Sequence, residues 1–229
     1  MLKDPPLLSV RRNFKRPDLA VVDTLIGAQT GHITDARYGR GALDAAIKPV
    51  DPANATFAGV AYPVTTFADD NLAILAVLAY VKPGDVIVVA ADGFSRTAVV
   101  GDNIAMMAKN AGVRAIVIDG MARDLDGIVG AGLPLHARGI TPNSCVKNGP
   151  GKVGFEVVVG GVSVAPGDVV IGDRDGIVVI PQGELAHVVS HLDEIRRLEA
   201  ETQAKIRAGM TCPDNIRALL ASGNVVFVD

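Results

Sequence analysis

The chain contains no tryptophan, and aromatic residues of any kind make up only 4% of its 229 residues. Its only cysteines, Cys145 and Cys212, lie far apart and outside any C-x-x-C arrangement. This spacing argues against a disulfide framework and a zinc site, and it is compatible with a reducing compartment. The small and β-branched residues that remain are typical of an α/β protein with short buried strands.

Long apolar runs and excess charge are also missing. The most apolar windows, residues 72–81 and 86–91, are too short to span a bilayer, and the N-terminus has no stretch long enough for a signal peptide. The net charge of −3 gives no electrostatic reason to expect a nucleic-acid partner. We therefore expect a soluble, cytoplasmic protein with no membrane association, in which the short basic cluster at residues 11–16 is a solvated or subunit-contacting arm.

The first half of the chain alternates helical and strand patterns. Apolar residues at helical spacing predict helices, and continuous β-branched or alternating runs predict strands. The predicted helices cover residues 18–29, 70–81 and 103–110, and the predicted strands cover residues 56–67 (interrupted at Pro63), 86–91 and 113–119. Residues 86–119 therefore form a strand–helix–strand unit, whose crossover gives parallel pairing.

The second half has short strands joined by tight turns, as in an antiparallel meander. The predicted strands are 153–159, 162–164, 169–172 and 177–180, and they precede predicted helices over 183–207 and 214–221. A parallel layer beside an antiparallel layer predicts a β/β/α arrangement. We expect one domain over residues 1–229, with its core at about 18–209 and a helical C-terminal extension over 210–229.

Charged residues follow two neighbouring strands of the predicted sheet. Asp102 comes after the strand over 86–91, and Arg123 with Asp124 comes after the strand over 113–119. Loops at the carboxyl ends of adjacent parallel strands share one crevice, so we expect these three side chains to meet. By position alone, an equally good interpretation is that Asp102 caps its helix, while Arg123 and Asp124 cap the next helix and form a salt bridge.

The chemistry of this group favours a binding site. Two carboxylates beside an arginine suit a hard divalent cation such as Mg²⁺ or Mn²⁺. Such a cation leaves positions open for an α-keto acid and stabilises the enolate formed when a C–C bond breaks. The backbone amides of Gly101, Asp102, Asn103 and Ile104, at a helix N-terminus, would bind a carboxylate. Arg123 could hold a second carbonyl or the developing alkoxide.

At these residues the sequence resembles the RraA-like family, which includes the class II 4-hydroxy-4-methyl-2-oxoglutarate / 4-carboxy-4-hydroxy-2-oxoadipate aldolases. The family's D-x20-R-D motif is matched by Asp102, twenty intervening residues, and Arg123-Asp124. The resemblance runs from about Val21 to Gly209. It also includes KPGDVIVV at 82–89, GDN at 101–103, GMARD at 120–124, GVSVAPGD at 161–168 and DRDGIVVIP at 173–181.

The resemblance implies a swivelling β/β/α fold and a homotrimer, or a hexamer built as a dimer of trimers, with active sites at subunit interfaces. It implies that Asp124 binds Mg²⁺ or Mn²⁺ directly, that Asp102 acts through a water molecule, and that Arg123 polarises a substrate oxygen. Lys147 falls where the family can have a basic residue near the pocket, and a surface-turn lysine is an equally good interpretation.

Two further residues match the acidic positions that a neighbouring subunit supplies in the aldolases. These are Asp35, which is shorter than the glutamate expected there, and Glu199 in the predicted C-terminal helix. The histidines are assigned no catalytic role: we expect His136 to be structural, and His187 and His191 to lie on a solvated helix face rather than to bind a metal.

The function that the resemblance implies is lyase chemistry on a small 2-oxo acid. The reaction is metal-dependent retro-aldol cleavage of a 4-hydroxy-2-oxo dicarboxylic or tricarboxylic acid to pyruvate and an oxo acid, with oxaloacetate decarboxylation as a side activity. The alternative is a non-catalytic trimeric regulator that binds a ribonuclease or another protein. The intact Asp102, Arg123 and Asp124 set favours the enzyme, because a binding trimer has no physical need for it.

Overall fold

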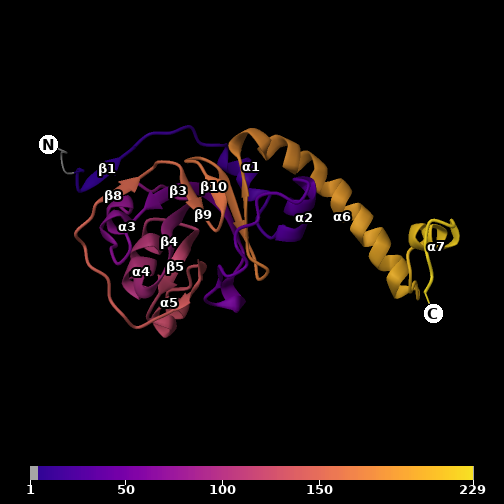
Figure 1. The fold of residues 1–229 in the computed structure, drawn as a ribbon. Helices are drawn as coiled ribbons and strands as arrows, with labels where there is room; N and C mark the ends of the chain where they lie inside the picture. Colours follow the sequence, from indigo (N-terminus) through magenta and orange to yellow (C-terminus); the bar gives the residue numbers. More distant parts are fainter. Residues whose placement is uncertain (1–4, 229) are drawn as a thin grey trace.

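The computed structural model describes residues 5–228, and a mixed β-sheet lies at its centre (Figure 1). Its three longest strands are β3 (Phe57–Thr65), β4 (Asp85–Val100) and β5 (Ala115–Ala122). β4 pairs in parallel with both β3 and β5. The parallel crossover predicted over residues 86–119 is therefore confirmed, with α4 (Asp102–Asn110) as its connecting helix.

The two faces of the central strands are covered by different kinds of structure. On one face, alternate residues such as Ile87 and Val89 pack in a core with α3 (Leu72–Val77), α4 and α5 (Leu125–Ala131). On the other face, Val86 and Val88 pack with the antiparallel hairpin of β9 (Val157–Val159) and β10 (Val162–Val164). Burial on both faces explains the unbroken β-branched run, and the layers give the expected β/β/α arrangement.

Short strands extend the sheet at its edges. β11 pairs antiparallel with β3 and with β12, which confirms the antiparallel turn predicted between residues 169–172 and 177–180. The predicted meander is not continuous, because β9 and β10 form a separate two-stranded sheet and β11 pairs with β3 instead of β10. The remaining strands are short: β8 pairs with β3 and β1 with β8, while β6 and β7 pair with β5 and β2 with β6. Their bounds are β1 (Leu8–Val10), β2 (Lys48–Pro49), β6 (Leu135–Ala137), β7 (Gly139–Ile140), β8 (Gly151–Val153), β11 (Val169–Gly172) and β12 (Ile177–Ile180), with 3-10 turns at Pro52–Asn54 and Gln182–Glu184.

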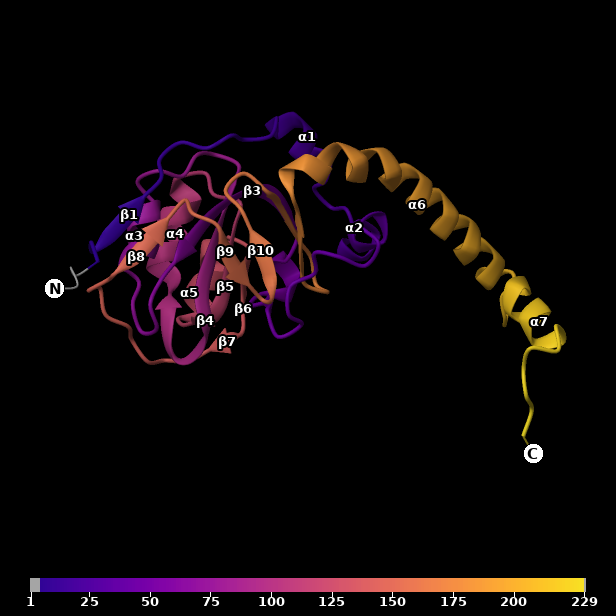
Figure 2. The same ribbon diagram turned by 45° about the horizontal axis from the view of Figure 1, so that its top comes forward.

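A third apolar core joins β11 and β12 to the terminal helices. α1 (Leu19–Asp23), α2 (Thr30–Ala36) and the first turns of α6 (Leu185–Arg207) pack there. Beyond Leu192 the helix α6 has no buried residue and extends away from the sheet toward α7 (Asp214–Ala221), as both views show (Figures 1 and 2). The helix predicted over 214–221 is confirmed, and α6 begins two residues later than expected.

Across residues 5–228, every helix is too short or too polar to cross a membrane.

The prediction of one helix over residues 18–29 is wrong. α1 ends at Asp23, Gly27 adopts a positive φ of 82°, and a second helix, α2, begins at Thr30. The Asp173 carboxylate accepts hydrogen bonds from the Thr30 amide (2.8 Å) and hydroxyl (2.9 Å), which satisfies a free donor of the first turn. That partner lies in the β11–β12 turn, so no local pattern around Thr30 indicates it.

The strand predicted over 86–91 is much longer in the structure. β4 continues to Val100 through Asp92 (φ 51°) and Gly93 (φ 69°), beyond the predicted end of the strand, and its pairing with β5 shifts register three times beyond Ala90. These irregularities let the strand bend without ending, and they carry it to the start of α4. In contrast, the helix predicted over 70–81 is shorter, because α3 covers only Leu72–Val77.

Two strand predictions fail, one at a proline and one at a glycine. β3 is not interrupted at Pro63, because the Pro63 carbonyl points toward the Gly154 amide (2.8 Å) and away from β4, so the missing N–H removes no bond to β4. The strand predicted over 153–159 instead divides at Gly154, which has a φ of 77°. Its two parts become β8 in the central sheet and β9 in the outer hairpin.

Within the basic N-terminal segment, Arg11, Arg12 and Lys15 are exposed, but Arg16 packs on the protein. Arg16 forms a two-pronged ion pair with the carboxylate of Asp85, which is 1% exposed, and its guanidinium lies over the Phe14 ring. Asp85 also accepts from the Lys82 amide at 2.8 Å. A buried carboxylate requires such partners, so residue 16 has a structural role that charge counting did not reveal.

His136 is expected to make the protein less stable at mildly acidic pH. The residue has no solvent exposure, and its Nε2 lies 3.0 Å from the Asp173 carbonyl. Burial lowers the pKa of His136 below 6.5, and the bond to Asp173 only partly opposes this. The unfolded chain therefore binds a proton more readily, so this contribution is complete above about pH 6.5 and is lost as the pH falls.

The measurement is the free energy of unfolding by urea between pH 7.5 and 5.5, for the wild type and for His136→Gln. The wild type should lose stability over this range, and the variant should show a flatter dependence because its side chain does not titrate. Equal slopes for the two proteins would contradict the prediction. Burial also raises the pKa of Asp168. This shift increases the stability of the folded protein as the pH falls toward the usual pKa range of an aspartate, so it opposes the effect of His136. It is present in the wild type and in the variant alike.

Candidate functional site

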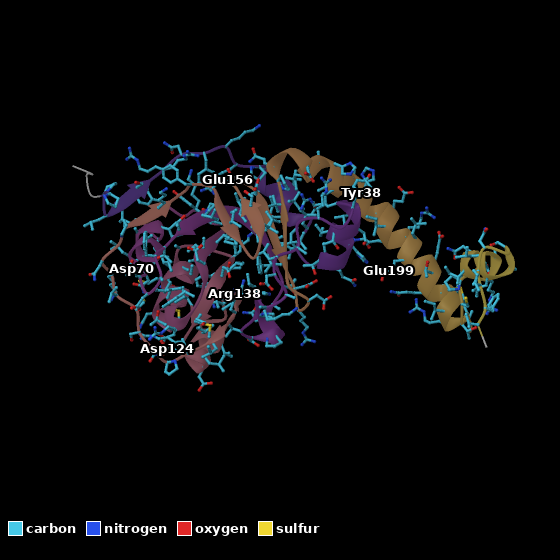
Figure 3. All side chains as sticks on the ribbon, viewed as in Figure 1. Tyr38, Asp70, Asp124, Arg138, Glu156 and Glu199 are labelled. Atoms are coloured by element: carbon cyan, nitrogen blue, oxygen red, sulfur yellow. The ribbon has the colours of Figure 1, made fainter. Side chains whose placement is uncertain are left out.

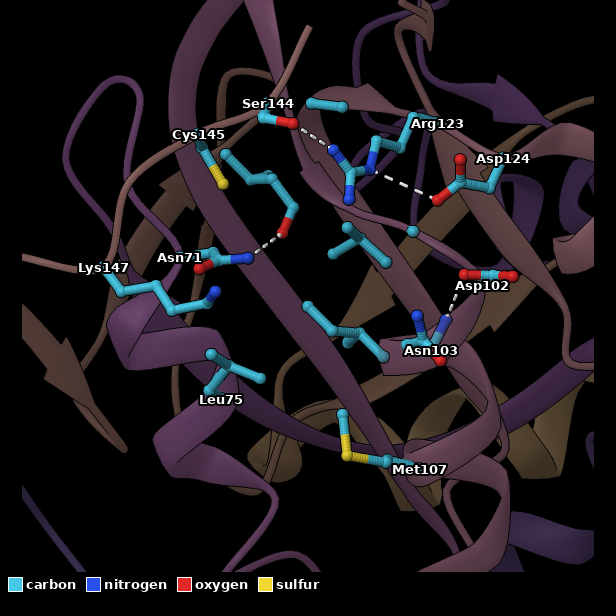
Figure 4. A pocket seen from close by; sticks show the side chains of 15 residues that line it. Asn71, Leu75, Asp102, Asn103, Met107, Arg123, Asp124, Ser144, Cys145 and Lys147 are labelled. Carbon is cyan, nitrogen blue, oxygen red and sulfur yellow. Dashed lines mark hydrogen bonds and ion pairs between the residues drawn. The ribbon is translucent and has the colours of Figure 1, made fainter. Parts of the chain in front are cut away.

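A pocket of about 370 Å³ opens at the carboxyl ends of β4 and β5, as Figure 4 shows. The volume is within the range of small-molecule sites. Its walls come from α3, the N-terminus of α4, the start of α5 and the segment 141–149, which we call the strap. All the residues expected to act within one subunit line it: Gly101, Asp102, Asn103, Ile104, Arg123, Asp124 and Lys147.

Asp102 is the first residue of α4, not its N-cap. That position belongs to Gly101, whose backbone is extended and which offers no side chain to the helix. The Asp102 Oδ1 accepts from the Asn103 amide at 2.6 Å, and the side chain remains partly open to the pocket. The helix dipole stabilises a negative charge in the first turn, so the Asp102 carboxylate needs no partner side chain to remain charged there.

Asp124 occupies the N-cap position of α5 in a left-handed conformation (φ 60°, ψ 52°). Its side chain makes no capping hydrogen bond, and its carboxylate is 43% exposed. Asp124 therefore does not cap the helix through its side chain. Of the structural roles considered for Arg123 and Asp124, only the salt bridge is present, with Arg123 Nε 3.2 Å from Asp124 Oδ2. The backbone bond from the Arg123 amide to the Val100 carbonyl (3.0 Å) holds the ends of β5 and β4 together.

The donor set fits a hard cation with few protein ligands. Asp102 and Asp124 offer two partly exposed carboxylates, and among residues 5–228 no group of three or more His, Cys, Asp or Glu side chains could enclose a metal. Magnesium and manganese accept one or two carboxylates and keep several waters, whereas structural zinc requires a closed set of four ligands. The residues present therefore fit Mg²⁺ or Mn²⁺.

The strap contributes the opposite wall. Lys147 lines the pocket and is exposed, so its position agrees with both the pocket and the surface-turn interpretations. Cys145 lies beside it, and burial raises the pKa of its thiol, with the charges of Asp69 and Asp70 acting in the same direction. The thiol is therefore neutral near pH 7, which makes it a poor nucleophile.

Among the pocket residues missed by sequence reasoning, two make polar contacts that shape the site. Arg123 Nη1 donates to Ser144 Oγ, and Asn71, at the start of α3, donates from Nδ2 to the Val99 carbonyl at 3.2 Å. Neither lies near Asp102, Arg123 or Asp124 in the chain. Their contacts depend on where the strap and α3 cross β4, and no local pattern encodes that crossing.

Asp35 and Glu199 do not belong to this pocket. They line a separate groove between α2 and α6, where Glu199 pairs with His32. Figure 3 shows Glu199 on the projecting helix, well removed from Asp124. Their contribution from a second subunit stays a prediction.

The remaining histidines behave as expected. His187 and His191 are exposed on α6, with ring centroids 4.1 Å apart, and His191 Nδ1 lies 2.8 Å from the His187 carbonyl.

Comparisons with known proteins point in one direction. The family model RraA-like, described as Aldolase/RraA, matches residues 21–179. A protein of Halalkalibacterium halodurans with the provisional name 4-hydroxy-4-methyl-2-oxoglutarate aldolase is 36% identical over 189 residues, which cover 82% of this chain and 87% of that protein.

Two solved structures are similar as well. Streptomyces coelicolor RraAS2, described as an unusual member of the RNase ES inhibitor RraA protein family, is 28% identical with a TM-score of 0.75, over 83% of this chain and 100% of that chain. The RNA-processing inhibitor RraA of Thermus thermophilis is 32% identical with a TM-score of 0.61, over 67% of this chain and 93% of that chain.

Proposed function

Because the chain belongs to the RraA-like family, we propose that it is a divalent-metal-dependent lyase that cleaves a 4-hydroxy-2-oxo dicarboxylic or tricarboxylic acid to pyruvate and an oxo acid. Oxaloacetate decarboxylation would be a side activity, because it passes through the same pyruvate enolate. The observation that carries the proposal is the meeting of Asp102, Arg123 and Asp124 in one pocket at the N-terminus of α4.

Each part of the pocket has a task in this reaction. Asp124 would hold Mg²⁺ or Mn²⁺ directly, and Asp102 would hold it through a water molecule. The bound cation supplies charge stabilisation for the enolate. Arg123 would donate to the substrate oxygen that is the aldol hydroxyl, where negative charge develops as the hydroxyl loses its proton, before it passes to the enolate on C–C cleavage.

The carboxylate of the pyruvyl group would bind at the start of α4. Backbone amides at a helix N-terminus favour anions. The Asn103 amide already donates to Asp102 Oδ1, so we expect the amides of Asp102 and Ile104 to provide most of the binding. Lys147, at the opposite wall, would attract the distal carboxylate of the substrate.

We further propose that the protein assembles as a homotrimer or hexamer, in which a second subunit presents Asp35 and Glu199 to the pocket. Both residues lie outside the pocket of their own chain, in a groove against the projecting helix α6. Such an arrangement would complete an acidic site that has only two carboxylates in one chain.

A protein-binding regulator is the second candidate function. Its support is the similarity to structures described as RraA inhibitors of RNA processing and of RNase ES. A regulator would act through its surface and would not depend on the exposed Asp124 carboxylate. Loss of that carboxylate would therefore leave binding to a protein partner unchanged.

Removal of divalent metal is expected to abolish pyruvate release. The purified protein would be assayed with oxaloacetate and with 4-hydroxy-4-methyl-2-oxoglutarate, with excess EDTA and after Mg²⁺ is restored. Pyruvate formation should fall to background with EDTA and recover with Mg²⁺, because the enolate loses its main charge stabilisation.

The control contains Mg²⁺ and oxaloacetate without protein, since the free metal also promotes decarboxylation. Equal rates with EDTA and with Mg²⁺, after this background is subtracted, would contradict metal dependence. No pyruvate from either substrate under any condition would contradict the lyase itself.

A further inference from the structure

Arg123 is held at two of its three guanidinium nitrogens. Nη1 donates to Ser144 Oγ on the strap, and Nε faces the Asp124 carboxylate at 3.2 Å. Figure 4 shows the third nitrogen, Nη2, turned toward the interior of the pocket. A planar guanidinium fixed along two edges has one direction left in which to present its remaining N–H groups.

The strap that carries Ser144 is itself firmly anchored. The Ala98 amide donates to the Asn143 carbonyl at 3.0 Å, and Ala98 and Ser144 form an isolated bridge between β4 and the strap. At the other end, the carboxylate of Asp70, a residue only 2% exposed, accepts from the amides of Asn148 (2.5 Å) and Gly149 (2.8 Å). Ser144 is therefore a fixed acceptor, whereas Arg123 is a long side chain that is 38% exposed and has several rotamers available.

Asp124 alone would hold Arg123 less well. An exposed ion pair contributes little, and in the proposed reaction the same carboxylate is needed for the metal. When its charge is shared with a cation, Ser144 is the remaining described contact that fixes the guanidinium plane. A neutral hydroxyl can do this without competing for the metal or drawing off the positive charge that the reacting oxygen requires.

We propose that Ser144 is a positioning residue for the reaction, which holds Arg123 so that Nη2 faces the substrate oxygen. This inference rests on the proposed lyase function. It assigns a catalytic contribution to the strap, and it separates orientation of Arg123, by Ser144, from orientation of the metal, by Asp102 and Asp124.

The kinetic test compares Ser144→Ala and Ser144→Thr in Mg²⁺-dependent pyruvate release from 4-hydroxy-4-methyl-2-oxoglutarate, a substrate that carries the aldol hydroxyl. Loss of a hydrogen bond to a charged group predicts that kcat falls about tenfold in Ser144→Ala. The KM should change less than twofold, because the misplaced arginine chiefly affects the charge that develops on the aldol oxygen in the transition state and not the binding of the neutral hydroxyl. Ser144→Thr keeps the hydroxyl and should recover most of kcat. Asn143→Ala, which removes only the 3.0 Å bond from the strap to the Arg96 carbonyl, is the matched control and should keep the wild-type kcat.

A double-mutant cycle shows whether Ser144 acts through Arg123. In an Arg123→Lys background the Nη1 donor is gone, so Ser144→Ala should lower kcat less than twofold further. An equal loss in both backgrounds would overturn the proposal. So would a rise in KM without a fall in kcat, or a failure of Ser144→Thr to recover activity.

A readout without catalysis comes from the metal-free protein. The Arg123 Nε–H resonance, assigned by its disappearance in Arg123→Lys, should shift in Ser144→Ala and stay near its wild-type position in Ser144→Thr. An unchanged resonance in Ser144→Ala would overturn the proposal even if the lyase function holds. An inactive wild-type protein would instead contradict the proposed function, so the two failures are distinguishable.

Discussion

Asp124→Asn is expected to lower Mg²⁺-dependent pyruvate release by about a thousandfold while the fold remains intact, which is the scale of loss when a preorganised charge is removed from an active site. Asparagine has the same shape as aspartate but carries no charge, so it would be a much weaker ligand for a hard cation. The experiment measures kcat and KM with oxaloacetate, Mg²⁺ affinity by calorimetry, and the thermal midpoint.

Asparagine is the better replacement because of the backbone at this position. Asp124 has a φ of 60°, a conformation that asparagine tolerates and alanine does not. Alanine would add about 1–2 kcal/mol of strain, which could distort the start of α5 and imitate a loss of the ligand. A large fall in activity with an unchanged thermal midpoint is therefore informative only for the asparagine variant.

Asp126→Asn is the matched control. This carboxylate lies two residues further along, in the first turn of α5, and does not line the pocket. This variant tests whether removing any negative charge near the start of α5 is enough to lower activity. We expect wild-type kcat for Asp126→Asn, whereas full activity of Asp124→Asn would contradict the metal-ligand role.

The sequence predicts those site residues whose positions follow from the order and pairing of adjacent strands. A buried β-branched run predicts a strand, and a crossover helix of ordinary length requires parallel pairing. From those two steps Asp102 and Arg123 were expected in one pocket, and the structure places them there. The apolar pattern of α7 likewise predicts its bounds, because that helix depends on local spacing alone.

The rest depended on contacts between distant segments. α2 begins where Asp173, far along the chain, holds Thr30. Ser144 reaches Arg123 because the strap bridges to Ala98 in the part of β4 that lies beyond the predicted end of the strand. The sequence of the strap has no periodicity, so neither its path nor its polar contacts could be read from it.

Gly101→Ala is expected to lower kcat about a hundredfold with little loss of stability, a scale that is ordinary for small displacements of catalytic groups. A Cβ at residue 101 would lie 2.5 Å from Asp124 Oδ2 and 3.3 Å from Arg123 Cγ. The backbone there is extended (φ −131°), so alanine is allowed and the only conflict is with these two side chains. Because Asp124 Oδ2 is the far end of a side chain, the carboxylate would move aside instead of the backbone.

Gly130→Ala is the control for the stability part of this argument. It lies in α5, and no atom comes within 4 Å of the place that an alanine methyl group would take there. The variant should therefore keep wild-type activity and gain about 0.5–1 kcal/mol of stability from helix propensity. Gly101→Ala should lose only a few tenths of a kcal/mol to about 1 kcal/mol, since alanine is a poorer N-cap than glycine.

The two glycine variants separate a steric effect at the site from a general effect on the helices. Kinetics and urea denaturation would be measured for both, and Mg²⁺ affinity should fall only for Gly101→Ala, because the displaced group is the proposed metal ligand. If Gly101→Ala kept the wild-type kcat and Mg²⁺ affinity, the position of the Asp124 carboxylate against Gly101 would be irrelevant to the chemistry. The absence of a side chain at residue 101 would then be explained by helix capping alone.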